Sequence, residues 1–133
     1  MKLPTRYGFA GIGALAALSL IHWLRGIEFP RNEVSSYLLG VSPNLCAAVA
    51  TTFVVLSIWA DQQKLFEYAN AKRWFWIAAS IAGVGLIGWE LAQLTMSSFV
   101  FDINDMGATF AGLVLSGAVF YLVTPRTAKL AGP

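Results

Sequence analysis

The chain has 133 residues, of which 57% are hydrophobic and 12% are charged, and its formal net charge is +2. Soluble domains carry about one-quarter charged residues, so this composition excludes an ordinary cytosolic enzyme, a nucleic-acid-binding protein and a disordered chain. It favours an integral membrane protein. The single cysteine, Cys46, excludes an internal disulfide and a cysteine-based metal site.

Four apolar segments follow one another along the chain. A membrane-spanning helix needs about 17 to 25 mostly apolar residues. The predicted spans are residues 7–24, 44–60, 74–94 and 106–123. Because backbone polar groups in lipid must find hydrogen bonds within the protein, the sequence predicts an all-α fold, a single four-helix transmembrane bundle.

The first segment shares features with a secretory signal peptide, since Lys2 and Arg6 precede an apolar run. That run is longer than the signal core of about 7 to 15 residues, and Arg25 follows it in place of a cleavage site. We therefore expect a retained first helix.

Local signals predict the helix ends. Ser42 and Pro43 suit the first turn of the second helix, because Ser caps helices and Pro is tolerated there. Residues 25–42 then form the longest external loop. Asp102 or Asn104 is expected to cap the fourth helix, and Pro125 to end it.

The distribution of Lys and Arg predicts the orientation, because cytoplasmic loops carry an excess of both. Seven of these residues lie on one side of the predicted spans and two on the other. This predicts that both termini are cytoplasmic. The larger group is Lys2, Arg6, Lys64, Lys72, Arg73, Arg126 and Lys129, and the smaller is Arg25 and Arg31.

Small and polar residues recur at helical spacing in each span, which predicts the faces where the helices meet. In the first span they are Gly8, Gly11, Leu15, Ser19 and His22, and in the second Asn44, Ala48 and Thr51. In the third they are Ala79, Gly83, Leu86, Glu90, Gln93 and Ser97, and in the fourth Asp105, Thr109, Gly112 and Ser116.

The polar members of these faces fall at the outer ends of the helices, which predicts an external binding pocket. They are His22, Arg25, Asn44, Glu90, Gln93, Asp102 and Asp105. Glu90 is the ionisable residue placed well inside a span, where a charge is expensive. It is either a contact for a ligand, proton or metal, or a structural hydrogen-bonding group.

Other patterns carry less weight. Asp102 and Asp105 suit a helix N-terminus, and with Glu90 they are also oxygen ligands of the kind a divalent cation takes, although no spacing is specific for a metal. The lone histidine, His22, excludes bis-histidine haem ligation. Gly83, Gly85 and Gly88 match the G-x-G-x-x-G pattern of dinucleotide-binding sites, but they lie in an apolar span and follow no strand, so we reject that interpretation. We predict no cofactor and no metal.

From Trp89 onward the chain resembles the VanZ-like family of small bacterial membrane proteins. The resemblance rests on Trp89-Glu90-Leu91-Ala92-Gln93-Leu94, on Phe101-Asp102-Ile103-Asn104-Asp105, and on Gly112 and Gly117. Glu90, Gln93, Asp102 and Asp105 match the family pattern position by position. Phe99 and Thr109 stand where the family has Arg and Asn.

The resemblance implies a multi-pass protein of the bacterial cell membrane, linked to the cell envelope and to glycopeptide (teicoplanin) resistance. Three hypotheses follow. The first is an accessory protein whose external pocket takes a lipid-linked envelope ligand or a membrane-protein partner. The second is an enzyme acting on a lipid-linked envelope substrate. The third, a small dimeric transporter, is disfavoured because exporters of this size carry their essential Glu in the first helix, and residues 7–24 contain no acid. The expected partners are the bilayer and such a ligand, and not a nucleic acid.

Overall fold

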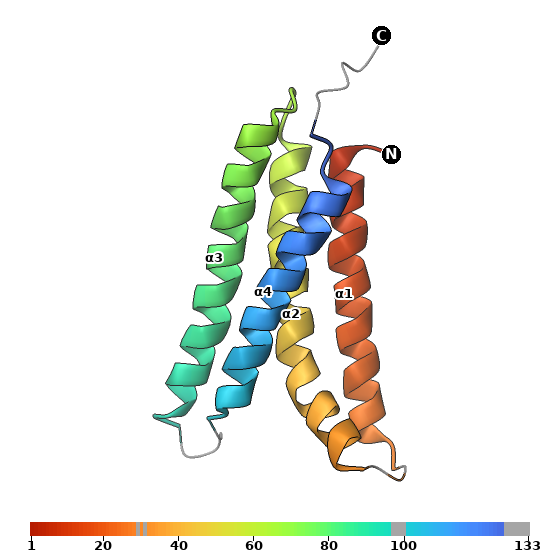
Figure 1. Ribbon diagram of the computed structural model, residues 1–133, viewed down its shortest axis with the longest axis vertical. Coiled ribbons are helices and arrows are strands. Elements are labelled where there is room, and N and C mark those ends of the chain that lie inside the picture. The colour runs from red at the N-terminus through yellow and green to blue at the C-terminus, as the bar shows by residue number, and fades with distance from the viewer. Residues whose placement is uncertain (29, 31, 97–100, 127–133) are drawn as a thin grey trace.

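The computed structural model describes residues 1–28, 30, 32–96 and 101–126. Within these ranges the chain forms four α-helices and no strand (Figure 1). Each helix is long and apolar enough to cross a membrane. The predicted all-α, four-helix architecture is confirmed. The helices are α1 (Leu3–Gly26), α2 (Glu33–Asp61), α3 (Tyr68–Gln93) and α4 (Ile103–Val123).

The start of the second helix was predicted wrongly. The helix α2 begins at Glu33, where the Asn32 side chain accepts a hydrogen bond of 2.8 Å from the backbone of Ser35. Pro43 lies inside the helix and not in its first turn. Helices in membranes tolerate an interior proline. Pro43 lacks the N–H that would bond to the Leu39 carbonyl, and the preceding Ser42 donates its hydroxyl to the Leu38 carbonyl one turn back.

The longer α2 changes the geometry of the end of the bundle away from the termini. Its 29 residues span about 43 Å, so the helix is longer than a hydrocarbon core of about 30 Å is thick. The connection between α1 and α2 shortens from the predicted loop 25–42 to residues 27–32.

The helix α2 is the centre of the assembly, since it packs against each of the other three helices. Across the described residues, α1 and α3 do not contact each other. The helices α1 and α4 meet only sparsely, through hydrogen bonds near the two termini. Figure 1 shows α1 and α4 converging at that end and separating toward the other.

An aromatic cluster joins the four helices near the termini. Tyr7, Phe53 and Phe120 are fully buried and Phe75 nearly so. The ring centroids of Phe75 and Phe120 lie 4.6 Å apart, and those of Tyr7 and Phe53 lie 5.9 Å apart. The Tyr7 hydroxyl shares a hydrogen bond of 2.9 Å with the Thr124 hydroxyl. This cluster holds α1 against α4.

Removing the Tyr7 hydroxyl should measure that attachment. Tyr7→Phe keeps the buried ring and leaves the Thr124 hydroxyl without its partner, so we expect a loss of stability of about 1 kcal/mol. The measurement is the thermal unfolding midpoint in detergent. Tyr121→Phe is the matched control. It makes the same chemical change in the last turn of α4, near Thr124, at a side chain that is 47% exposed. Equal midpoints for the two variants would contradict the role of the hydroxyl pair.

The predicted packing faces hold for the third and fourth helices. Ala79, Gly83, Glu90 and Gln93 are buried on α3, and Thr109, Gly112 and Ser116 are buried on α4. Ser97 lies outside the described residues.

The predicted face of the first helix is wrong over its second half. Leu15, Ser19 and His22 are exposed. Over the first half the prediction is confirmed, because Gly11 is buried and a Cβ on Gly8 or Gly11 would meet Ser57 or Val54 of α2. The core side of α1 also presents the buried Tyr7 and the partly buried Leu3, Ala10 and Ala14, which the spacing of small and polar residues did not identify. On α2, Thr52 is buried where Thr51 was expected.

Candidate functional site

A buried carboxylate lies in the last turns of α3. Glu90 is 3% exposed. The Asn44 amide donates a hydrogen bond of 3.4 Å to Glu90 Oε1, which is long for a bond of this kind. Glu90 Oε2 is buried and accepts no hydrogen bond from the described part of the chain. This carboxylate therefore retains acceptor capacity, since each of its oxygens has two lone pairs.

Two further acids lie where α4 begins. Asp102 is the N-cap, and its Oδ1 accepts hydrogen bonds of 2.8 Å from the backbone and side-chain nitrogens of Asn104. The predicted capping role of Asp102 is confirmed. Asp105 follows in the first turn and interacts electrostatically with Glu90, Asp102 and Arg25, while its side chain pairs with Asn44. Asn44 thus connects the acid on α3 with the acid on α4.

A cavity of about 340 Å³ opens beside these acids, at the end of the bundle away from the termini. We call it the polar cleft. Arg25 contributes from the last turn of α1, and Asp102 and Asp105 contribute from the start of α4. The rest of its wall belongs to the N-terminal part of α2: Ser36, Tyr37, Gly40 and Val41.

Five of the predicted site residues therefore gather at one end of the molecule. Arg25, Asp102 and Asp105 line the polar cleft, while Asn44 and Glu90 lie behind Asp105. The binding role assigned to this group stays a prediction.

Two predicted residues stand apart from the polar cleft. Gln93 is buried on the same face of α3 as Glu90, but it does not line the cleft. His22 is exposed and does not line it either.

Sequence reasoning missed the wall that α2 supplies. Ser36 and Tyr37 were assigned to a loop, because Pro43 was expected in the first turn of the helix. The signal that identifies them is Asn32, which stands three residues before Ser35 and caps the helix with its side chain. Because this cap starts α2 at Glu33, the first turns of the helix include Ser36 and Tyr37, which line the polar cleft together with the acids of α4.

Charge in this region is unbalanced among the residues the structure describes. The carboxylates of Glu90, Asp102 and Asp105 stand against the guanidinium of Arg25. In the same residues, no three His, Cys, Asp or Glu side chains are arranged to hold a metal ion. The chemistry on offer is recognition of a positive or zwitterionic group by carboxylates, with a guanidinium beside them for an anionic group.

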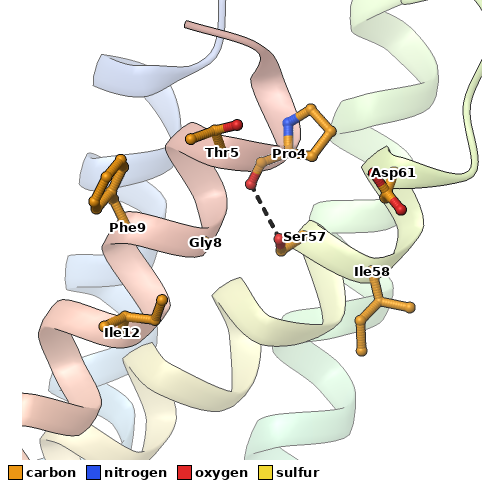
Figure 2. A pocket seen from close by; sticks show the side chains of 8 residues that line it. All are labelled: Pro4, Thr5, Gly8, Phe9, Ile12, Ser57, Ile58 and Asp61. Carbon is orange, nitrogen blue, oxygen red and sulfur yellow. Dashed lines mark hydrogen bonds between the residues drawn. The ribbon is translucent and has the colours of Figure 1, made fainter.

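A second cavity, of about 410 Å³, lies between α1 and α2 near the termini. Figure 2 shows residues 4–12 of α1 facing residues 57–61 of α2, with the Ser57 hydroxyl bonded to the Pro4 carbonyl at 3.0 Å. Its wall is mainly apolar apart from Asp61 and two hydroxyl residues. None of the predicted site residues lines this second cavity, whereas Arg25, Asp102 and Asp105 line the polar cleft.

Comparison with known proteins adds no relative: no protein-family model, no curated protein and no solved structure matches the chain.

Proposed function

We propose that this chain is a VanZ-like, multi-pass protein of the bacterial cell membrane with an accessory, ligand-binding role in the cell envelope. The polar cleft is its binding site, and the ligand is a lipid-linked envelope molecule or a membrane-protein partner. The observation that carries the proposal is the buried Glu90, whose Oε2 lacks a hydrogen-bond partner in the described chain, directly behind a charged cleft.

The orientation of the cleft follows from the Lys and Arg distribution. Among the residues that the structure describes, the end that carries the termini has six of these residues and the cleft end has one, Arg25. The positive-inside rule then puts the termini in the cytoplasm and the cleft on the outer side of the membrane. An envelope ligand reaches the cleft from that side.

The burial of charge supports a binding role over a purely structural one. A carboxylate inside a membrane segment costs about 2.5 to 3.5 kcal/mol on insertion scales. A structural role would compensate this cost with strong hydrogen bonds, whereas within the described part of the chain Glu90 has one long bond, to Asn44. Acids retained in this state are functional candidates.

Glycopeptide susceptibility tests the accessory role. Expression of the chain in a susceptible bacterial host should raise the minimal inhibitory concentration of teicoplanin severalfold. Asp105→Asn should remove the increase at unchanged protein level, because it neutralises a wall of the cleft. Glu33→Gln is the control, since Glu33 is exposed at the start of α2 and does not line the cleft. An unchanged inhibitory concentration with the wild-type chain would overturn the proposed resistance role.

A further inference from the structure

The polar cleft presents both signs of charge on different helices. Arg25 comes from α1, and Asp102 and Asp105 come from α4. A guanidinium has five N–H donors, so it can hold a phosphate while it keeps an interaction within the protein. The carboxylates offer acceptors to a group with several donors, such as a primary ammonium.

The imbalance of charge favours a ligand that brings a positive group. Asp105 lies in the field of Glu90 and Asp102 with Arg25 as the opposing charge. Glu90 adds negative charge from a buried position, where the lower dielectric strengthens its effect on the cleft. A ligand that carries only an anion would meet net repulsion beyond Arg25. A ligand with a phosphate and an ammonium satisfies both sides.

The architecture favours a lipid as the source of that ligand. The helices α1 and α4 meet near the termini, and at the other end the cleft is lined by the ends of α1 and α4 and by the N-terminal part of α2. Arg25 is in the last turn of α1, and Asp102 caps α4. These helix ends lie at headgroup depth in a spanning bundle. Tyr37, 54% exposed on the cleft wall, is the type of residue enriched at that depth.

We propose that the polar cleft binds a zwitterionic phospholipid headgroup with a primary ammonium, of the phosphoethanolamine type. The phosphate lies at Arg25, and the ammonium lies at Asp105 with Asp102 beside it. Glu90 is a positioning residue that acts through Asn44 and Asp105. This inference rests on the proposed function, because it names the ligand class of the same site.

Native mass spectrometry of the purified full chain tests the assignment. The protein in detergent is titrated separately with phosphatidylethanolamine, phosphatidylcholine and phosphatidylglycerol of matched acyl chains. We expect severalfold greater retention of phosphatidylethanolamine, since phosphatidylcholine has no ammonium N–H donor and phosphatidylglycerol has no positive group. Soluble phosphoethanolamine is the competitor that distinguishes a free solute from a lipid, and we expect it to displace the lipid weakly.

Matched variants localise the binding. Asp105→Asn should abolish the preference for phosphatidylethanolamine, and Arg25→Gln should lower its retention. Asp61→Asn makes the same chemical change on the α1–α2 groove near the termini and should leave the preference intact. Thermal unfolding midpoints near the wild-type value confirm that each variant is folded. Glu90→Gln gives a second route to the same loss if Asp105→Asn fails to fold.

Three outcomes would overturn the inference. The first is equal retention of the three lipids. The second is a preference for phosphatidylethanolamine that survives both Asp105→Asn and Glu90→Gln. The third is soluble phosphoethanolamine that competes for the cleft as strongly as phosphatidylethanolamine does. The proposed function fails separately. If the lipid preference is absent while Asp105→Asn still removes teicoplanin resistance, only the ligand class is wrong.

Discussion

Gly112→Leu should lower the stability of the protein more than any other glycine substitution in the bundle. A Cβ at this position would lie 2.5 Å from the Leu45 carbonyl oxygen and 2.9 Å from the Ala48 Cβ. The first of these is backbone, so α2 and α4 would have to separate. Overpacking of this kind costs about 1 to 3 kcal/mol or more, and we expect about 3 kcal/mol, seen as a large fall in the unfolding midpoint in detergent.

Two other glycines grade the effect. A Cβ on Gly83 would lie 3.1 Å from Leu113 Cδ1, the flexible end of a side chain, whereas one on Gly88 would meet nothing within 4 Å. The expected order of destabilisation is therefore Gly112→Leu, then Gly83→Leu, then Gly88→Leu with little change. Similar midpoints for the three variants would mean that the crossing of α2 and α4 is not as close as described.

Glu90→Gln should leave the protein folded and remove its function. Glutamine has the shape of glutamate, and its amide oxygen can accept the same hydrogen bond from Asn44. The substitution removes the buried charge that acts on Asp105. We therefore expect an unfolding midpoint at or above the wild-type value and the loss of both teicoplanin resistance and headgroup preference. Full function in Glu90→Gln would show that the charge has no role in binding.

The partner residue gives an independent check on the same pair. Asn44→Ala removes the donor to Glu90 Oε1 and leaves that buried carboxylate with no hydrogen-bond donor from the described part of the chain, which should cost about 1 to 3 kcal/mol. In the Glu90→Gln background the same change should cost less, because a neutral amide is easier to bury. Additive effects in this double-mutant cycle would mean that the two side chains do not interact.

Hydropathy and helical spacing were sufficient for much of the fold. The four apolar runs located the helices, since lipid exposure forces long uninterrupted apolar segments. The spacing of Gly83, Glu90 and Gln93 identified the buried face of α3, because a polar residue and a small residue on one face of a membrane helix both avoid lipid. The same reasoning placed Glu90 and Asn44 at one end of the bundle.

Two features were beyond these signals. Proline is typical of the first turn of a helix in soluble proteins, but Pro43 lies in the middle of α2. For this reason Ser36 and Tyr37, which line the polar cleft, were assigned to a loop. In α1 the packing face depends on Tyr7, whose ring fits between Phe53 and Phe120. Such a fit is set by the other helices. His22 was placed in the pocket by spacing alone and is exposed.

Cysteine labelling in intact cells determines whether the polar cleft opens on the outer side of the membrane. In a Cys46→Ala background, single cysteines replace Ser36 on the cleft wall and Gln63 at the opposite end. An Asn32→Cys variant marks the α1–α2 connection beside the cleft. We expect a membrane-impermeant maleimide to label Ser36→Cys and Asn32→Cys in intact cells and to label Gln63→Cys only after permeabilisation. Labelling of Gln63→Cys alone in intact cells would contradict it, because the cleft would then face the cytoplasm.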